Sequence, residues 1–450
     1  MVGWVVLDSR ALTKIQSVAL IAIIVVAAVG GGAGYVLWRG GLLPPEDIKI
    51  GICADLDMSS GKSVYQAALL AAEQVNAEGG VLGRNITIVA EDDDDEMLSI
   101  DIKVVSNAMT KLITVDNADY VVTNAIGVGV VFPLQDICAE HKKICFSVRA
   151  IHDNITQRVI DNYERYKYFF KFGGTNQTTS TAGLLGDILA LANYTGFTKI
   201  AFLGHDFPAI WQTADSLANS LPKHGLEVVY SRIIPTTTTD FTSYFAAVEA
   251  AGAEILVPYI ATQASVSLVK EWYDRQSPCI IYGSLSNVDK SDFWDVTEGK
   301  CECVSFASVP ATVGYPLTNK TIPTWTAYLQ RWGTVPGSSA VAAYDGIRFI
   351  LPDALRRAGT TETEALIKAL ETTNVETSLA RHFVFTSSHD LMVGGDSPNN
   401  PAEDYVLVAV FQWQANKTQV LVKPEQLMKE AGATFKYPPW TGPWNSKQTS

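Results

Sequence analysis

The sequence contains few groupings of residues that could perform chemistry. The acidic run Glu91–Glu96 could bind Ca²⁺, but it lacks the alternating spacing, the glycine turn and the distal glutamate of an EF-hand loop. We therefore interpret it as a solvated turn between a strand and a helix. The pair His205-Asp206 suggests a general base, yet no nucleophile accompanies it, and no phosphate-binding or nucleophile-elbow motif is present. The sequence therefore predicts a protein that is not an enzyme and that uses no metal or other cofactor.

Two stretches could instead hold a small anion. The segment Gly127–Gly129 lies between a predicted strand and a predicted helix, where backbone N–H groups can approach a ligand. Arg149 follows another predicted strand, at the edge where open α/β sheets bind ligands. Its guanidinium could clamp a carboxylate through two hydrogen bonds, or it could form a structural ion pair with an acid such as Asp57. Trp211 is the aromatic residue that we favour as a pocket wall.

These residues are positioned by alternating strands and helices. The first unit comprises a strand at Ile48–Cys53, a helix at Lys62–Asn76 and a strand at Asn85–Ala90. Strands separated by helices of this length indicate parallel sheets that are covered on both faces. The same alternation restarts after Gly173-Gly174. We therefore predict an α/β fold with two doubly wound lobes.

Length and charge agree with this interpretation. A chain of 450 residues is too long for one compact core, and its 47% hydrophobic and 18% charged residues are typical of a globular protein. The net charge of −13 argues against a nucleic-acid partner, which requires a basic face.

An uncharged apolar segment, residues 17–38, precedes the globular part. As a helix it would be roughly 33 Å long, which is enough to cross a bilayer. Two basic residues before it and one after it weakly favour an N-terminus inside the cell. We predict a retained single-pass anchor in the cell membrane, with a cleaved secretory signal as the alternative. Residues 1–16 would be a short cytoplasmic or processed segment, residues 39–46 a linker, and the remainder would be extracellular.

The cysteines and the glycosylation sequons fit such an outer location. Six cysteines could form three disulfides in an oxidising compartment, and no Cys-x-x-Cys spacing favours zinc. We favour Cys138 with Cys145, and Cys279 with Cys301 or Cys303. Asn-X-Ser/Thr sequons predict N-glycosylation, although composition alone is the alternative explanation. They lie at Asn85, Asn154, Asn176, Asn193, Asn319 and Asn416.

Several motifs together resemble the branched-chain amino-acid binding proteins of ABC transporters. They are IKIGIC followed by a Ser/Gly loop, AALLAAEQVNAEGGVLGRNITIVAEDDDD, FPLQDICAEHKKICFSV, AAYDGIRFILPDALRRAG and VAVFQW, within roughly residues 47–423. The segment Arg10–Gln16 also resembles the pilin-like signals of archaeal binding proteins. The resemblance implies a type I periplasmic binding protein fold, in which two Rossmann-like lobes close about a three-strand hinge.

The resemblance also implies domain boundaries. Lobe one would comprise residues 47–172 and 311–384, lobe two residues 173–310 and 385–425, and residues 426–450 would form a C-terminal tail. The crossovers would lie near Phe172, Val309 and Phe385.

By the same resemblance the chain is expected to be an extracytoplasmic solute-binding protein of an ABC importer. Its partners would be a small-molecule ligand and the permease subunits in the membrane. Arg149 stands where the family has alanine, and Ser284 or Leu285 replaces the acid that receives an amino acid's ammonium. The expected ligand is therefore an amino acid, an amide or an organic carboxylate.

The alternatives are the ectodomain of a sensory receptor system and, less favoured, a hydrolase. The expected ligand-binding residues are Ser59, Ser60, Gly127, Val128, Gly129, Ser147, Arg149, Ala150, Ile151, Asp206, Trp211, Tyr259, Thr262, Gln263, Ser284 and Leu285.

Overall fold

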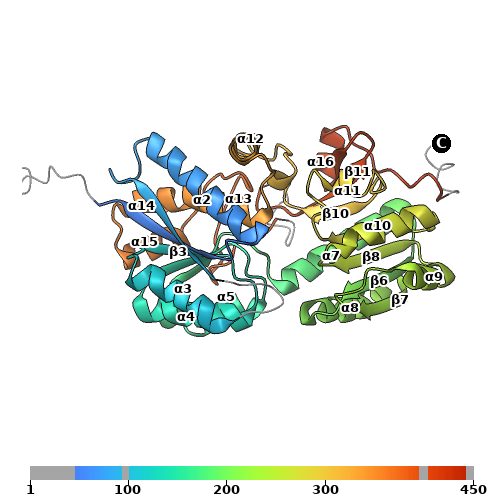
Figure 1. The fold of residues 1–450 in the computed structure, drawn as a ribbon, viewed down its shortest axis with the longest axis horizontal. Coiled ribbons are helices and arrows are strands. Elements are labelled where there is room, and N and C mark those ends of the chain that lie inside the picture. Colours follow the sequence, from blue (N-terminus) through green and yellow to red (C-terminus); the bar gives the residue numbers. More distant parts are fainter. Residues whose placement is uncertain (1–45, 94–100, 395–403, 442–450) are drawn as a thin grey trace, which may run out of the picture.

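Two α/β lobes lie end to end along the long axis of the molecule (Figure 1). The computed structural model describes residues 46–93, 101–394 and 404–441. Lobe one is built on a five-stranded sheet and lobe two on a seven-stranded sheet. The predicted two-lobed α/β class is therefore confirmed.

The lobe-one sheet has the strand order β2-β1-β3-β4-β5, and all its strand pairs are parallel. Because β2 and β3 pair with opposite edges of β1, the strand order reverses there, and a crevice is expected at the carboxyl ends of β1 and β3. The strands are β1 (Ile48–Ala54), β2 (Ile86–Asp92), β3 (Tyr120–Thr123), β4 (Ile144–Ser147) and β5 (Phe169–Lys171). The helices that follow them are α2 (Ser59–Ala77), α3 (Ile102–Thr114), α4 (Val128–His141), α5 (Asp153–Asp161) and α6 (Tyr163–Tyr166).

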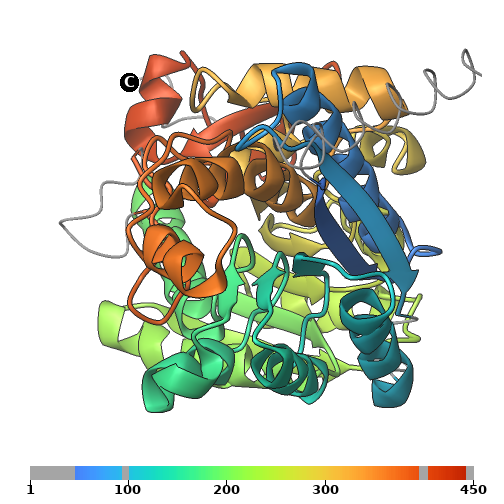
Figure 2. The ribbon, with the colours of Figure 1, turned by 90° about the vertical axis from the view of Figure 1, so that its left-hand side faces the viewer.

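Helices cover both faces of this sheet (Figure 2). Residues of α3 and α4 share one apolar cluster with the strands, and α2 shares the other with helices from much later in the chain. These later helices are α13 (Ser338–Asp345), the π-helical η3 (Gly346–Ile350), α14 (Leu351–Ala358) and α15 (Thr363–Glu371). Lobe one is therefore completed by residues more than 160 positions beyond its last strand.

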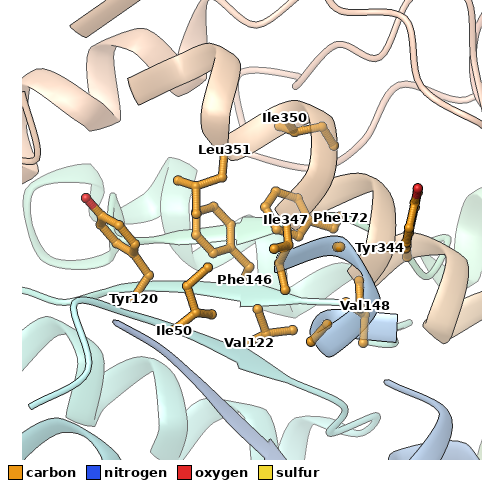
Figure 3. Packing of buried hydrophobic residues seen from close by; sticks show 14 of the residues in the cluster. Ile50, Tyr120, Val122, Phe146, Val148, Phe172, Tyr344, Ile347, Ile350 and Leu351 are labelled. Carbon is orange, nitrogen blue, oxygen red and sulfur yellow. The ribbon is translucent and has the colours of Figure 1, made fainter. Parts of the chain in front are cut away.

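The second cluster depends on a close approach between η3 and the end of the sheet. Phe146 and Phe172 stack with their ring centroids 4.2 Å apart, beneath Ile347 and Leu351 (Figure 3). A Cβ atom on Gly346 would lie 2.0 Å from Cδ2 of Phe172, so the contact requires glycine at that position. The π-helical turn η3 lies directly between α13 and α14.

The lobe-two sheet has the order β12-β11-β10-β9-β8-β6-β7. Its strands are parallel from β7 to β10, and the terminal hairpin β11-β12 joins β10 in the antiparallel direction. The strands are β6 (Lys199–His205), β7 (Glu227–Ile234), β8 (Ile255–Ile260), β9 (Ile280–Leu285), β10 (Ser305–Ser308), β11 (Ala409–Gln414) and β12 (Thr418–Lys423). The helices are α7 (Gln177–Thr195), α8 (Pro208–Ser220), α9 (Thr242–Ala250), α10 (Ala264–Arg275), α11 (Phe293–Val296) and α16 (Glu425–Glu430), with 3₁₀ turns η1 (Leu221–His224) and η2 (Pro310–Thr312).

The described chain passes between the lobes at the carboxyl edges of both sheets. From the end of β5 it runs into α7, and from the end of β10 it returns through η2 to α12 (Thr321–Trp332), whose Tyr328 lies in the lobe-one core. The third passage between the lobes follows Val406, which packs in lobe one, whereas Leu407 packs in lobe two. It lies later than the crossing expected near Phe385, because that ring packs edge-on against Phe170 at 5.1 Å. The carboxyl edges of the two sheets are therefore turned toward the same junction.

The C-terminal segment belongs to lobe two. Met428 and Phe435 are buried in its two apolar clusters, and Gln412 Nε2 donates to the carbonyl oxygen of Lys436 at 2.8 Å. The described part of the predicted tail, residues 426–441, therefore packs against the sheet.

The predicted anchor, residues 17–38, lies outside the described residues. Among the described residues, no helix is long and apolar enough to cross a membrane.

The predicted disulfides are absent from the structure, in which the six cysteines are buried thiols. Cys138 and Cys145 pack with Cys53 in one apolar cluster, and Cys279 and Cys301 pack in another. The hydrogen bond from Cys138, together with burial, raises the pKa of the Cys145 thiol well above its usual value. These residues therefore act as small apolar core residues.

The sequons differ in accessibility. Asn176 is half-buried, because its Nδ2 donates to Thr156 Oγ1 at 2.9 Å and its Oδ1 accepts from Lys171 Nζ at 2.8 Å. A glycan on that amide would break both contacts. Glycosylation stays a prediction for the exposed positions Asn85, Asn154, Asn193, Asn319 and Asn416.

A buried carboxylate beside the π-helical turn makes the fold sensitive to pH. Asp345 is fully buried, its Oδ2 accepts from the Leu379 backbone at 3.1 Å, and burial raises its pKa to about 7. Because the unfolded state releases this proton near pH 3.8, the folded state holds more protons between pH 4 and 7 and loses stability as pH rises through that window. We expect Asp345→Asn to remove about 3 kcal/mol of this pH dependence between pH 5 and pH 8. Urea unfolding at pH 5 and pH 8 measures it, and an unchanged pH dependence in the variant would contradict the assignment.

Candidate functional site

The carboxyl edge of lobe one carries two helix N-termini beside the switch point. Ser59 and Ser60 lie in the first turn of α2, which begins earlier than predicted because Asp55 Oδ1 accepts from the backbone N–H groups of Asp57 and Met58 at 3.0 and 2.9 Å. This turn fixes the first residues of α2 at the end of β1. The predicted loop serines therefore lie at the rim of the expected crevice.

The second helix N-terminus is that of α4, capped by Gly127 in an extended conformation. The first backbone N–H that bonds back to Gly127 is that of Val130, so the amides of Val128 and Gly129 have no partner within the helix. A Cβ atom placed on Gly127 or Gly129 would meet nothing within 4 Å. The positive end of the helix dipole is therefore open to a ligand.

A buried hydroxyl shapes the next segment of this edge. Ser147 Oγ accepts from the backbone N–H groups of Arg149 and Ala150 at 3.4 and 3.0 Å, which folds the chain sharply after β4. The Ile151 N–H then donates to the Ile126 carbonyl at 3.4 Å, beside the start of α4. Arg149 is half-buried here. The structure thus brings together the predicted segments 127–129 and 147–151.

Asn124 is a residue that the sequence interpretation missed. It directly follows β3, its backbone N–H donates to the Cys53 carbonyl at 3.1 Å, and its side chain is 5% exposed. Its Oδ1 is buried and has no hydrogen-bond partner among the described residues. Such a group costs folding free energy unless another molecule supplies a donor. The only sequence signal was its position, just after a strand and before a glycine-rich turn.

In lobe two, His205 lies at the end of β6, the counterpart of β1. Because β7 and β8 flank β6, this is the switch point of the second sheet. His205 Nδ1 accepts from the Ala261 N–H at 3.3 Å, so the ring proton resides on Nε2, which is buried without a partner in the described structure. Burial lowers the pKa of the imidazole, which favours the neutral ring. Each lobe therefore places a buried, unpartnered polar atom at its switch point.

The predicted loops of lobe two surround His205. Asp206 and Trp211 are exposed and bonded to each other, since Trp211 Nε1 donates to Asp206 Oδ1 at 2.9 Å. After β8, Thr262 Oγ1 accepts from the Ala264 N–H at 3.3 Å, and Gln263 is the exposed N-cap of α10. Asp206, Thr262 and Gln263 lie on the loops that follow β6 and β8, and Trp211 lies in the first turn of α8. They can therefore line the lobe-two side of the crevice.

Tyr259 and Ser284 lie elsewhere, beside a cavity of about 630 Å³. The cavity extends along α7 and reaches the third passage between the lobes at Val393, Gly394 and Val408. Leu285, by contrast, is buried in a lobe-two cluster. Of the predicted lobe-two residues, Tyr259 and Ser284 therefore line this cavity, and the residues that follow β6 and β8 do not.

Residues 47–395 match the family of periplasmic binding proteins, and this is more than half of the chain. The chain therefore belongs to that family, whose members bind solutes.

Similar proteins include the following curated relative and solved structures. The Leu/Ile/Val-binding protein homolog 3 of Brucella melitensis is 22% identical over 382 residues, which cover 82% of this chain and 92% of that protein. A putative branched-chain amino acid ABC transporter from Silicibacter pomeroyi superposes with a TM-score of 0.75 at 19% identity, covering 88% of this chain and 100% of that one. A solute-binding protein of an ABC transporter from R. palustris, in complex with benzoate, gives a TM-score of 0.63 at 14% identity, with 84% and 95% covered.

The unpartnered amide of Asn124 provides a test of the lobe-one edge. Replacing it with leucine removes a buried polar atom that lacks a partner, so we expect Asn124→Leu to raise the stability of the ligand-free protein by about 1 kcal/mol. As a control, Gln135→Leu should destabilise, because Gln135 Nε2 donates to Ile155 and its Oε1 accepts from Arg158. Thermal unfolding without ligand measures both. A lower melting temperature for Asn124→Leu would mean that its role is structural.

Proposed function

We propose that this chain is the extracytoplasmic solute-binding protein of an ABC importer, which captures a small ligand between its two lobes. The observation that supports this proposal most is that the switch points of the two sheets lie at the same junction between the lobes. The carboxyl edges of both sheets meet at the same junction, and each offers a buried polar group, Asn124 or His205, together with flanking loops. Ligands of open α/β sheets bind at such points, and closure of two lobes excludes water from between them.

The ligand that suits this crevice carries a carboxylate. In lobe one the free amides at the start of α4 and the Arg149 guanidinium both favour an anion. In lobe two the neutral His205 ring and the Asp206-Trp211 pair offer hydrogen bonds and an aromatic surface. A relative is named for leucine, isoleucine and valine, and a similar structure holds benzoate. We propose an amino acid or an aromatic carboxylate as the ligand of this chain.

The proposal includes a location and a partner. Residues 17–38 would anchor the chain in the membrane, with the lobes outside the cell, and the permease subunits would receive the closed, loaded protein. Sequence supports this through the uncharged segment and its flanking basic residues. Extraction of the full chain from membranes by carbonate, without detergent, would contradict the anchor.

Ligand screening tests the proposed function. We expect the full chain to be stabilised on heating by leucine, isoleucine, valine or benzoate, because a ligand that binds only the folded state raises its melting temperature. Calorimetry then gives the affinity and a stoichiometry. If none of these four compounds and no other amino acid or aromatic carboxylate shifts the melting temperature, the proposed ligand class is wrong.

The start of α4 offers a sharper test of the crevice. We expect Gly129→Leu to leave the melting temperature unchanged, since a Cβ there meets nothing within 4 Å, and to weaken the binding of benzoate by about ten-fold or more, because the new side chain covers the helix amides. Glu140→Leu, at the exposed end of the same helix, is the matched control. Equal benzoate affinities in the two variants would exclude this helix from the site.

A further inference from the structure

We propose that lobe two contains a second small-molecule site, between α7 and the β11-β12 hairpin, that binds a zwitterion with an apolar side chain. This goes beyond the proposed function, because the site lies on the α7 side of lobe two, touches lobe one at Val393, and shares none of the crevice residues at the switch points. The site consists of two adjoining cavities and of the charged residues that line both of them.

Two cavities adjoin along α7. The first has a volume of about 630 Å³ and opens beside the passages between the lobes, and the second has a volume of about 200 Å³ and lies between α7 and the β11-β12 hairpin. Both are lined by Pro424 and by three polar residues, Asp187 of α7, Tyr282 of β9 and Lys423 of β12. A molecule that reached these three residues from the first cavity could therefore extend into the second.

The three shared residues form a charged cluster. Asp187 Oδ1 contacts Lys423 Nζ, and the Tyr282 hydroxyl donates to Asp187 Oδ2. The Asp187 side chain is 11% exposed and that of Lys423 is 34% exposed, so the ammonium keeps donors available on its open side. Burial raises the pKa of Asp187. The cluster thus presents a carboxylate and an ammonium side by side, with no net charge.

Charge complementarity selects the occupant. An anion or a cation bound here would leave one charge of the buried cluster without compensation, which is strongly unfavourable at low dielectric. A zwitterion avoids this, because its ammonium pairs with Asp187 while its carboxylate pairs with Lys423. The separation of the two charges in an α-amino acid matches two groups that contact each other directly.

The second cavity defines the other end of the occupant. Apart from the charged cluster it is lined mainly by apolar side chains, and its volume is that of several water molecules, at about 30 Å³ each. A branched aliphatic or an aromatic side chain fits such a space and gains from leaving water. The apolar lining residues are Ala190, Leu191, Val410, Val422, Met428 and Phe435.

The first cavity also touches the third passage between the lobes. Val393, Gly394, Leu407 and Val408 line it, and the chain leaves lobe one between Val406 and Leu407. An occupant would therefore contact a segment whose path depends on how far the lobes are closed. The site is placed to sense or to bias closure of the crevice.

Calorimetry on the full chain tests the proposal with three probes that share one carbon skeleton. Leucine carries both charges, 4-methylpentanoate lacks the ammonium, and isoamylamine lacks the carboxylate. In the Gly129→Leu background, where the crevice is obstructed, we expect leucine to bind and the other two probes to bind at least about ten-fold more weakly. Absence of leucine binding in this background, or equal binding of the three probes, would overturn the proposal.

A double variant isolates the charged cluster. Asp187→Leu with Lys423→Met replaces the buried pair by apolar side chains, a change that usually preserves folding, whereas either single change leaves a buried charge alone. We expect the double variant in the Gly129→Leu background to unfold cooperatively, at a lower temperature because the buried Tyr282 hydroxyl loses its acceptor, and to lose leucine binding. In the wild-type background it should keep benzoate binding in the crevice. Undiminished leucine binding by the double variant in the Gly129→Leu background would refute the second site. Loss of benzoate binding by the double variant without Gly129→Leu would refute the crevice as the site that binds benzoate.

Discussion

The relation between the two lobes depends on one buried ion pair. Lys171, at the end of β5, is completely buried, and its Nζ lies 2.9 Å from Asp390 Oδ1 on the segment that leads to the third passage. Burial lowers the pKa of Lys171 and raises that of Asp390, so each charge is tolerated only because the other is present. The same ammonium donates to Asn176, the N-cap of α7. The pair therefore fixes the first helix of lobe two against the last strand of the lobe-one sheet.

A second contact acts on the same helix from the other side. Asp153 of α5 accepts from the backbone N–H and the hydroxyl of Thr178, at 3.2 and 3.0 Å. A carboxylate of lobe one thus caps the N-terminus of a lobe-two helix, which is stabilised by the helix dipole. The α7 helix is held at its start by groups of lobe one and passes beside both lobe-two cavities. Movement of the lobes must therefore act on this helix.

Much of the fold could be predicted because strand and helix periodicities are local. The alternation of apolar runs and Ala-rich helices predicted both doubly wound sheets, and the glycine turn at Gly127 predicted the start of α4. Other features depend on contacts between distant residues. Lys171 in an aromatic run gives no sign of its partner at Asp390, and Asp187 in the middle of a helix resembles a solvent-exposed residue until β12 brings Lys423 against it. The paired cysteine spacing suggested a disulfide, but the same residues serve as apolar packing.

Neither lobe is formed by a continuous stretch of chain. The lobe-one core needs α13 to α15, and the lobe-two sheet needs β11 and β12, which begin only at Ala409. A chain that has not yet been completed leaves the α2 side of the lobe-one sheet partly uncovered and β10 without its neighbour β11, because these segments come last. Native contacts of such long sequence separation make folding slow and leave early intermediates prone to association. The order of synthesis therefore delays folding until nearly the whole chain has been made, a schedule compatible with passage of the unfolded polypeptide across a membrane.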